Sequence, residues 1–315
     1  MKQSSSRPSL RAAVANGRKQ AREVLAFRAA QRPKRNRAVR AAATRGVAPA
    51  VTPAAGMIKE LGPAASAGVL LAEGDSWFDY PFHDVLRMLE DDFGYDVESV
   101  AHKGDRVEDM AYAKGQFEEL ARRLEKLIRQ HRVPRAILLS GGGNDIAGEE
   151  FVLLLNHAAS ALPPINDSVV TGVIDQRLRD AYATIVSALD TIASSYLGRP
   201  IPIIAHGYDY PIPDGRGYLG GFWVLPGPWL RPGFERKGYP DLERNTGYMK
   251  VLIDRFNQML AALSRSPEFP NLHYLDLRKT LVAQRYKDDW DNELHPTRRG
   301  FGLVTAKLAG LIEGL

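Results

Sequence analysis

The chain of 315 residues contains no cysteine. This absence excludes a disulfide framework, a thiolate nucleophile and a cysteine-ligated metal, and it leaves the redox compartment open. The sequence also has no run of ~18 consecutive apolar residues, so we expect no membrane-spanning helix. With 44% hydrophobic and 25% charged residues, the composition is that of a soluble globular protein with a sizeable core, in one large domain or two small ones.

Acidic residues are almost missing from the first fifty positions. Glu23 is the single acid there, against 13 Lys or Arg, so residues 1–50 carry +12 and the whole-chain charge of +5 leaves −7 for the remainder. A segment of this composition is expected to be a mostly disordered or partly helical, solvated arm. Residues 51–66, rich in Ala, Gly and Pro, are expected to link the arm to a domain over 67–315.

The arm also lacks the apolar core of a secretory signal. We expect a cytoplasmic location, while a transit-like role or non-classical export of the arm remains open. A sharper alternative is that the arm binds nucleic acid or another anionic partner. The residues that favour this alternative are Arg32, Lys34, Arg35, Arg37 and Arg40. Phe27 is the only aromatic residue in the arm, so the sequence shows no platform for stacking bases.

Short apolar runs alternate with amphipathic segments through the rest of the chain. The runs end in glycine or polar residues, which is typical of buried parallel strands. We expect strands at 68–73, 96–101, 135–140, 201–205 and 272–277. We expect helices at 83–92, at 117–131, from about 170 to a stop before Gly198, at 246–264 and at 297–315. This alternation predicts an α/β fold whose five-stranded parallel sheet is covered on both faces.

Residues 207–245 are too long for an ordinary connection between a strand and a helix, which has roughly 2 to 6 residues. They are rich in aromatic residues, Gly and Pro. We interpret the segment as an aromatic insertion after the fourth strand, either a lid over a ligand site or a small core of its own.

Polar residues stand where the predicted strands end. Ser76 follows the first strand in Gly74-Asp75-Ser76, and Asn144 follows the third in Gly142-Gly143-Asn144-Asp145. The carboxyl ends of parallel strands open into a shared crevice. A serine hydroxyl becomes a nucleophile only when a base takes its proton. Among seven histidines, we choose His295 as that base because the others lie on predicted helices or strands or at strand ends.

Acyl transfer also needs donors that stabilise a negatively charged oxygen. The backbone N–H groups of Ser76 and Gly104 and the side-chain amide of Asn144 can supply three of them. Gly104 suits this role because a backbone without a Cβ atom can approach a substrate closely. No cofactor is needed for this chemistry, and we expect neither a cofactor nor a metal.

These four blocks, Gly74-Asp75-Ser76, Gly104, Gly142-Gly143-Asn144-Asp145 and His295-Pro296, resemble those of the SGNH, or GDSL-type, hydrolase superfamily. The resemblance spans about residues 68–315. It implies a three-layer, flavodoxin-like sandwich and a metal-free serine esterase or acyl hydrolase. It also implies that Ser76, Gly104, Asn144 and His295 act in the roles described above. We expect substrate contacts from Trp77, Tyr208, Trp223 and Trp229.

One position departs from the superfamily pattern. An aspartate usually stands three residues before the histidine, and here that position is Asn292, with Asp291 one residue earlier. An amide oxygen can orient an imidazole ring, but it cannot neutralise an imidazolium. Either Asp291 replaces the missing carboxylate or Asn292 supports a weaker pair, and the sequence leaves both open.

The leading hypothesis is therefore hydrolysis of a carboxylic ester or thioester of a small molecule, lipid or glycan through an acyl-serine. Deacetylation of a carbohydrate ester is an alternative on the same fold. A metal-dependent phosphoesterase is disfavoured, because the sequence has no pair of closely spaced histidines. A non-catalytic scaffold that binds an anionic partner through its basic arm is the alternative from another class.

Overall fold

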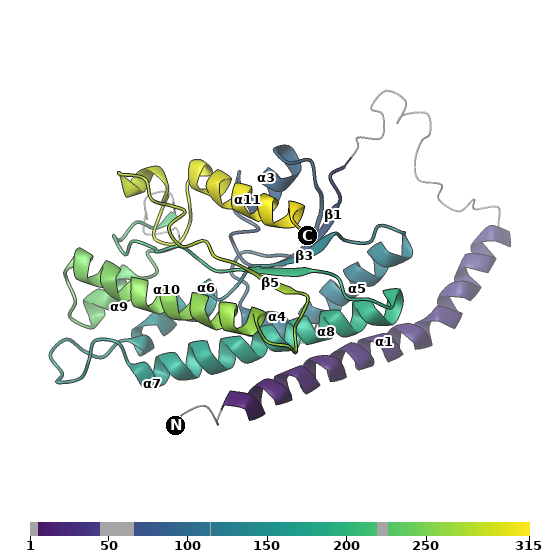
Figure 1. Ribbon diagram of the computed structural model, residues 1–315, viewed down its shortest axis with the longest axis horizontal. Helices are drawn as coiled ribbons and strands as arrows, with labels where there is room; N and C mark the ends of the chain where they lie inside the picture. The colour runs from purple at the N-terminus through teal and green to yellow at the C-terminus, as the bar shows by residue number, and fades with distance from the viewer. Residues whose placement is uncertain (1–5, 45–65, 114, 219–225) are drawn as a thin grey trace.

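Five parallel strands form the central sheet of the computed structural model, which describes residues 6–44, 66–113, 115–218 and 226–315 (Figure 1). The strands are β1 (Val69–Glu73), β2 (Asp96–Ser99), β3 (Ala136–Leu139), β4 (Ile203–His206) and β5 (Leu272–Leu275). The side chains of β3 and β4 are entirely buried, as their continuous apolar sequences predict. The predicted α/β class and the five-stranded all-parallel sheet are confirmed.

The strand order β2-β1-β3-β4-β5 places β1 between β2 and β3. The chain therefore adds β2 on one side of β1 and then β3, β4 and β5 on the other side. In such doubly wound sheets the ligand crevice lies where the order reverses, outside the carboxyl ends of the two central strands. Ser76 follows β1 and Asn144 follows β3, so both stand at this switch point.

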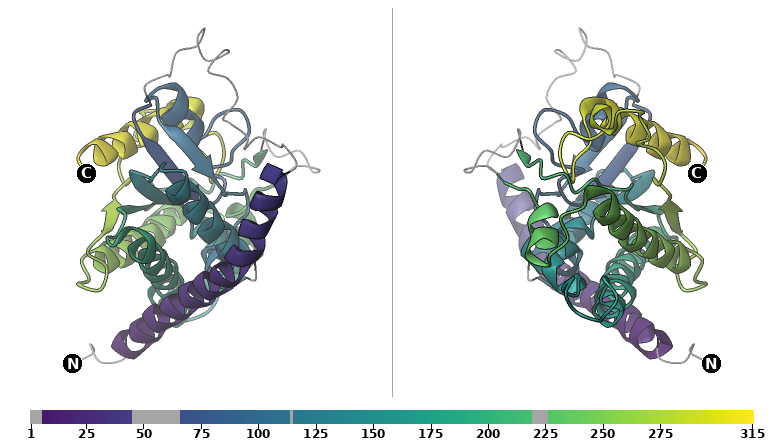
Figure 2. Two further views of the ribbon diagram at one scale, coloured as in Figure 1. Left: turned by 90° about the vertical axis from the view of Figure 1, so that its right-hand side faces the viewer. Right: turned by 90° about the vertical axis from the view of Figure 1, so that its left-hand side faces the viewer.

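Helices cover both faces of the sheet (Figures 1 and 2). One face carries α3 (Val85–Asp91) and α11 (Arg298–Glu313), which pack against each other. The other carries α4 (Val107–Tyr112), α5 (Gln116–Arg129), α8 (Arg179–Leu197) and α10 (Leu242–Ser264). The predicted helix at 83–92 begins only at Val85, because the Asp84 side chain caps it by accepting the N–H of Arg87.

Shorter helical elements connect the main ones. They are α6 (Gly143–Ile146), a 3₁₀ helix (Gly148–Leu154), α9 (Arg231–Arg236) and a 3₁₀ turn (Tyr286–Asp288). The predicted long helix is present as α7 (Asp167–Val170), a π-helical stretch (Thr171–Leu178) and α8 in succession. It ends at Gly198, which has a left-handed φ of 69°, the conformation that favours glycine after a helix.

The N-terminal segment, for which we expect a mostly disordered or partly helical arm, is helical over the residues that the structure describes. Residues Ser6–Thr44 form one helix, α1. Its first half packs along α8 on the outer side of the helical layer, and its second half leads away from the sheet (Figure 2). The packed half buries Ala13, Val14 and Ala21 and thus adds to the core of the protein.

A stripe of small residues allows α1 to approach α8 closely. Ala13, Gly17 and Ala21 are four residues apart and therefore share one face of the helix. A Cβ atom on Gly17 would lie 2.2 Å from the carbonyl oxygen of Thr184. The Thr184 hydroxyl donates to the carbonyl oxygen of Ala13, which ties the two helices together. The composition of the segment, with its many Arg and Lys residues, does not reveal this spacing of small residues.

Candidate functional site

The turn after β1 holds Ser76 at the edge of the sheet. Gly74 has no room for a side chain, since a Cβ atom there would lie 2.7 Å from the Ser140 side chain and 2.9 Å from the ring of Phe78. The buried carboxylate of Asp75 accepts the backbone N–H of Trp77 at 3.0 Å and the Ser140 hydroxyl at 2.8 Å. Together these contacts fix the turn and leave Ser76 half-buried at its tip.

His295 lies directly beside Ser76. The Ser76 hydroxyl and His295 Nε2 are 2.7 Å apart, within hydrogen-bond distance. Two contacts hold the loop that carries the histidine. Trp77 Nε1 donates to the carbonyl oxygen of Leu294 at 3.0 Å, and the ring of Tyr80 stacks on the imidazole with centroids 4.3 Å apart. The serine and the histidine, 219 positions apart in the sequence, thus form one pair.

Asn292 orients the imidazole of His295. Asn292 Oδ1 lies 2.9 Å from His295 Nδ1 and also accepts the backbone N–H groups of Leu294 and His295, each at 3.0 Å. A flipped amide would point its NH₂ group at three donors, so the oxygen must face the ring. Nδ1 therefore carries the proton, and Nε2 is left as the acceptor for the Ser76 hydroxyl.

Asp291 does not contact the imidazole. Its Oδ2 accepts the Tyr80 hydroxyl at 3.2 Å and lies 3.3 Å from Asn292 Nδ2. Asn292 Nδ2 also donates to the Tyr80 hydroxyl at 3.0 Å. Of the two alternatives left open by the sequence, Asn292 occupies the position beside the ring. Asp291 is connected to the ring through hydrogen bonds only by way of the Asn292 amide.

Burial keeps the imidazole neutral. His295 is only 6% exposed, and desolvation lowers its pKa from 6.5 to about 3. Among the described residues, no carboxylate forms a hydrogen bond or ion pair with the ring to offset this effect. The ring is therefore unprotonated at neutral pH and able to accept a proton from Ser76.

Hydrogen-bond donors face the same space from the loop after β2. Gly104 has a φ of 90°, and nothing lies within 4 Å of the position that its Cβ atom would take. Asn144 Nδ2 donates to the carbonyl oxygen of Asp105 at 2.9 Å. In the part of the chain that the structure describes, no protein acceptor receives the N–H of Ser76 or Gly104. Both groups are available to a negatively charged oxygen.

Asp145, which the sequence analysis did not single out, braces this loop. Its carboxylate accepts the N–H of Val107 at 2.9 Å and of Glu108 at 3.3 Å, at the start of α4. Burial raises the pKa of Asp145 to about 6. Asn144 and Asp145 together tie the ends of β2 and β3 to each other, so the donors are held in place before any ligand arrives.

Two hollows meet at Ser76. The larger, a cleft of about 440 Å³, is lined by Tyr80, Lys103, Gly104, Asn144, Tyr218, Trp229 and His295 among others. The smaller, of about 50 Å³, lies beneath it and is mostly apolar, with Trp77, Ile146, Tyr208, Leu230, Met249 and Ile253 in its wall. Ser76, Asn144 and Leu294 border both.

The residues expected to contact substrate therefore lie in different places. Trp77 and Tyr208 are buried, at 3% and 7% exposure, and line only the small cavity. Trp229 lines the cleft with its ring centroid 5.5 Å from that of His295. Trp223 lies outside the described residues. Whether residues 207–245 form a lid stays a prediction.

Sequence reasoning missed Tyr80 and Glu293 as well as Asp145. Tyr80 is four residues after Ser76 in the same turn, and Glu293 lies between Asn292 and His295. Nothing in the sequence pattern distinguishes Tyr80 from an ordinary core tyrosine, or Glu293 from an ordinary surface acid. Their roles follow only from the hydrogen bonds that they make across the fold.

No metal-binding cluster of three or more His, Asp or Glu occurs among the described residues. Within the same residues, no helix is long and apolar enough to cross a membrane. The side chains around Ser76 can instead perform acyl transfer with their own groups: a hydroxyl, a neutral imidazole, and N–H donors placed around one point.

Known proteins provide a fold-level comparison. No family model and no curated protein matches the chain. The solved structures similar to it include an acetylxylan esterase and a candidate SGNH hydrolase. A catalytic mutant of the acetylxylan esterase Axe2 from Geobacillus stearothermophilus is 15% identical, with a TM-score of 0.42 over 78% of this chain and 94% of that one.

Two further solved structures give similar values. A candidate SGNH hydrolase from Slackia heliotrinireducens is 14% identical, with a TM-score of 0.42 over 78% of this chain and 98% of that one. The α/β hydrolase LAE5, from the metagenome of Lake Arreo, is 13% identical, with a TM-score of 0.40 over 79% and 96%. The case for an activity therefore rests on the side chains described above.

Proposed function

We propose that this protein is an SGNH-type serine hydrolase that cleaves a carboxylic ester or thioester. The observation that carries the proposal is the hydrogen bond between the Ser76 hydroxyl and His295 Nε2, with Asn292 holding the ring in the required tautomer. A scaffold protein has no need of this geometry, since a buried neutral imidazole beside an accessible hydroxyl serves proton transfer.

The reaction follows from these groups. His295 Nε2 takes the proton as Ser76 Oγ attacks the carbonyl carbon, and the tetrahedral intermediate places negative charge on the former carbonyl oxygen. The N–H groups of Ser76 and Gly104 and the amide of Asn144 stabilise that charge. The imidazolium then protonates the leaving alcohol or thiol as the bond to carbon breaks, and water, activated by the same ring, hydrolyses the acyl-serine.

The size of the small cavity favours a short acyl group. A volume of about 50 Å³ corresponds to roughly three or four water-sized atoms. The buried side chains of Trp77, Tyr208 and Met249 enclose it on several sides. We assign this cavity to the acyl part of the ester and the larger cleft to the alcohol part. Carbohydrate O-deacetylation is one reaction of this class.

A p-nitrophenyl ester series tests this assignment. We expect kcat/KM for the acetate and butyrate to exceed that for the octanoate by about tenfold or more, because a longer chain must displace packed side chains. The activity should survive EDTA, since proton transfer and charge stabilisation use protein groups. The measurement is the release of p-nitrophenol with and without the chelator.

Met249→Ala provides the matched variant, because Met249 is 2% exposed and borders only the small cavity. The enlarged cavity should accept longer acyl chains while the acetate rate stays similar. A wild-type preference for octanoate, or the same profile in Met249→Ala, would contradict the assignment of the acyl site. Loss of activity in EDTA would contradict metal-free hydrolysis.

Asn292→Asp is expected to raise activity and to shift its pH dependence. A carboxylate at 292 would accept the same three N–H groups and would also stabilise the imidazolium, which raises a histidine pKa by roughly 1 to 3 units. In the wild type, kcat/KM should fall only as the pH approaches about 3, the pKa of His295. As the solution is acidified, the activity of the variant should begin to fall at a higher pH than that of the wild type. At pH 7 its kcat should be about tenfold higher.

The double variant Asp291→Asn/Asn292→Asp is the sharper form of this test. In the single variant the new carboxylate would stand near Asp291, whose Oδ2 lies 3.3 Å from the present Asn292 nitrogen. Exchanging the two residues removes that repulsion and keeps the net charge. If kcat and the acid limb of the profile were unchanged in the double variant, His295 would not be the group that titrates.

The positive charge of the N-terminal segment favours a second property, the binding of an anionic partner. Residues 1–50 carry +12, and the second half of α1 extends past the end of α8 (Figure 1). This charge supports binding of an anionic partner in addition to hydrolysis. The scaffold alternative would need that binding without any reaction at Ser76.

A further inference from the structure

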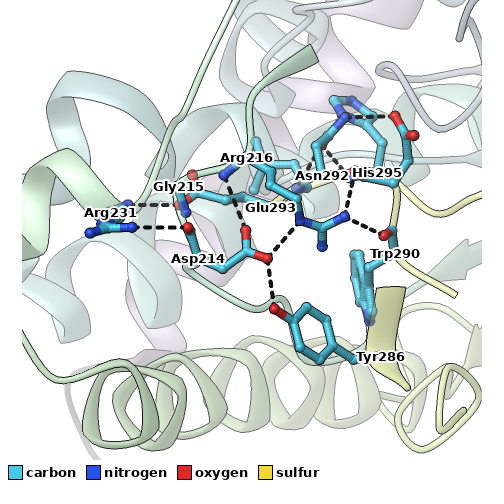
Figure 3. A network of polar contacts seen from close by, with 11 residues as sticks. Asp214, Gly215, Arg216, Arg231, Tyr286, Trp290, Asn292, Glu293 and His295 are labelled. Atoms are coloured by element: carbon cyan, nitrogen blue, oxygen red, sulfur yellow. Dashed lines mark hydrogen bonds and ion pairs between the residues drawn. The ribbon is translucent and has the colours of Figure 1, made fainter. Parts of the chain in front are cut away.

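Glu293 lies in the loop between Asn292 and His295 but takes no part in the contacts that orient the imidazole. It is fully buried, at 0% exposure. Its carboxylate faces the segment that connects β4 to α10, on the side of the loop opposite to Asn292 (Figure 3). A buried carboxylate is costly unless it is well hydrogen-bonded, so its partners show what it holds.

Four backbone N–H groups converge on this carboxylate. Oε1 accepts the N–H of Gly215 and of Arg231, each at 3.0 Å. Oε2 accepts the N–H of Trp229 at 2.6 Å and of Leu230 at 2.7 Å. Glu293 thereby joins two stretches of the segment, near 215 and at 229–231, that lie apart in the sequence. Burial raises the pKa of Glu293, and these hydrogen bonds oppose the rise.

Arg216, on the segment that connects β4 to α10, forms hydrogen bonds to the loop that carries His295. Its Nη1 donates to the carbonyl oxygens of Trp290 and Asp291, at 2.8 and 2.7 Å, and its carbonyl oxygen accepts the N–H of Glu293 at 3.2 Å. Asp214 holds the guanidinium through Nε at 2.6 Å. Figure 3 shows the two segments joined by these paired contacts. The connection is therefore made of a buried carboxylate on one side and a guanidinium on the other.

The segment held in this way forms one wall of the cleft. Tyr218 and Trp229 line the cleft beside His295, and the indole of Trp229 stands edge-on to the imidazole at an interplanar angle of 71°. The loop that holds the wall is the loop that carries the base. Glu293 thus joins this wall to the loop that carries His295.

We propose that Glu293 is a positioning residue that fixes the aromatic wall of Tyr218 and Trp229 against the loop of His295, so that this wall recognises the alcohol part of the ester. The inference rests on the proposed ester hydrolysis. It adds a specificity element: alcohols that present a ring face, either a planar aromatic ring or the C–H face of a sugar, contact the wall, whereas an ethyl group is too small to use it.

Glu293→Gln is the sharpest probe because it keeps the shape of the side chain. The amide has one acceptor oxygen, and its NH₂ group would face two of the four N–H donors. The wall should loosen, while Asn292 still orients His295 through contacts that do not involve Glu293. We expect KM for p-nitrophenyl acetate to rise about tenfold with kcat within about threefold. We expect kcat/KM for ethyl acetate to change less than about threefold.

Asp84→Asn is the matched control, because Asp84 is also a buried carboxylate that accepts a backbone N–H, at the start of α3. It should leave the ratio of the two esters unchanged. Hydrogen exchange supplies a readout that does not depend on activity. In Glu293→Gln the amides of 229–231 should exchange at least about a hundredfold faster, while those of β3 and β4 stay protected.

Each outcome decides between the hypotheses. If the two esters lose activity in parallel, Glu293 has only a structural role. If the amides of 229–231 exchange as in the wild type, Glu293 does not hold the wall. Either result overturns the positioning role, and ester hydrolysis still stands. If the wild type hydrolyses neither ester, the proposed function fails, and the wall has no substrate to recognise. Should Glu293→Gln not fold, Arg216→Gln breaks the same connection from the other side and must give the same split between the esters.

Discussion

Replacing Ser76 with alanine is expected to lower kcat for p-nitrophenyl acetate by about 10⁶-fold. The methyl group cannot attack the carbonyl carbon, so no acyl-enzyme forms. The fold should be unaffected, because the turn is held by Gly74 and by the carboxylate of Asp75 rather than by the Ser76 hydroxyl. Steady-state kinetics together with far-UV circular dichroism measure both points.

Ser99→Ala is the control for this experiment, since Ser99 ends the neighbouring strand β2 and lies outside the cleft. Its kcat should stay within about twofold of the wild type. A folded Ser76→Ala protein that retains a tenth of the wild-type kcat would show that the hydrolysis occurs elsewhere.

Replacing His295 with alanine is expected to lower kcat by at least about 10⁴-fold. Without the imidazole, no group takes the proton of Ser76 as it attacks. The N–H groups of Ser76 and Gly104 and the amide of Asn144 should still stabilise the intermediate, so a small rate above background is expected. This residual rate should increase with pH, because hydroxide then replaces the missing base. The pH profile of kcat is the measurement.

His273→Ala serves as the control, because His273 lies half-buried on β5, away from the cleft. It should change the stability of the protein and not kcat. Wild-type turnover in a folded His295→Ala protein would remove His295 from the mechanism and leave its contact with Ser76 structural.

Local sequence predicts the sheet and the placement of most of the site. Each buried strand is a short apolar run that ends in glycine or a polar residue, and parallel strands bring these ends to one edge. Ser76, Gly104 and Asn144 follow three adjacent strands and so meet there. The positions of Ser76 and Asn144 needed no knowledge of distant contacts, because the buried apolar runs of β1 and β3 end shortly before them. Gly104 follows β2, which is only partly buried and has no continuous apolar run.

Other features depend on contacts that a linear pattern does not contain. The orientation of the Asn292 amide follows from three N–H groups on one side and Tyr80 with Asp291 on the other. Likewise, the donors to Glu293 arrive from more than sixty positions away. For α1 the composition indicates a disordered or partly helical arm, and it does not contain the packing of the helix on α8, which depends on Gly17 and its small neighbours.

The account holds that one hydroxyl, one imidazole and three hydrogen-bond donors converge on a single point. A crystal structure of the wild-type chain after reaction with a small fluorophosphonate tests this most directly. The expected result is a covalent bond from Ser76 Oγ to phosphorus, with the phosphoryl oxygen about 2.7–3.1 Å from the N–H nitrogens of Ser76 and Gly104 and from Asn144 Nδ2. An adduct on another residue, or a folded chain whose Ser76 stays unmodified, would contradict it.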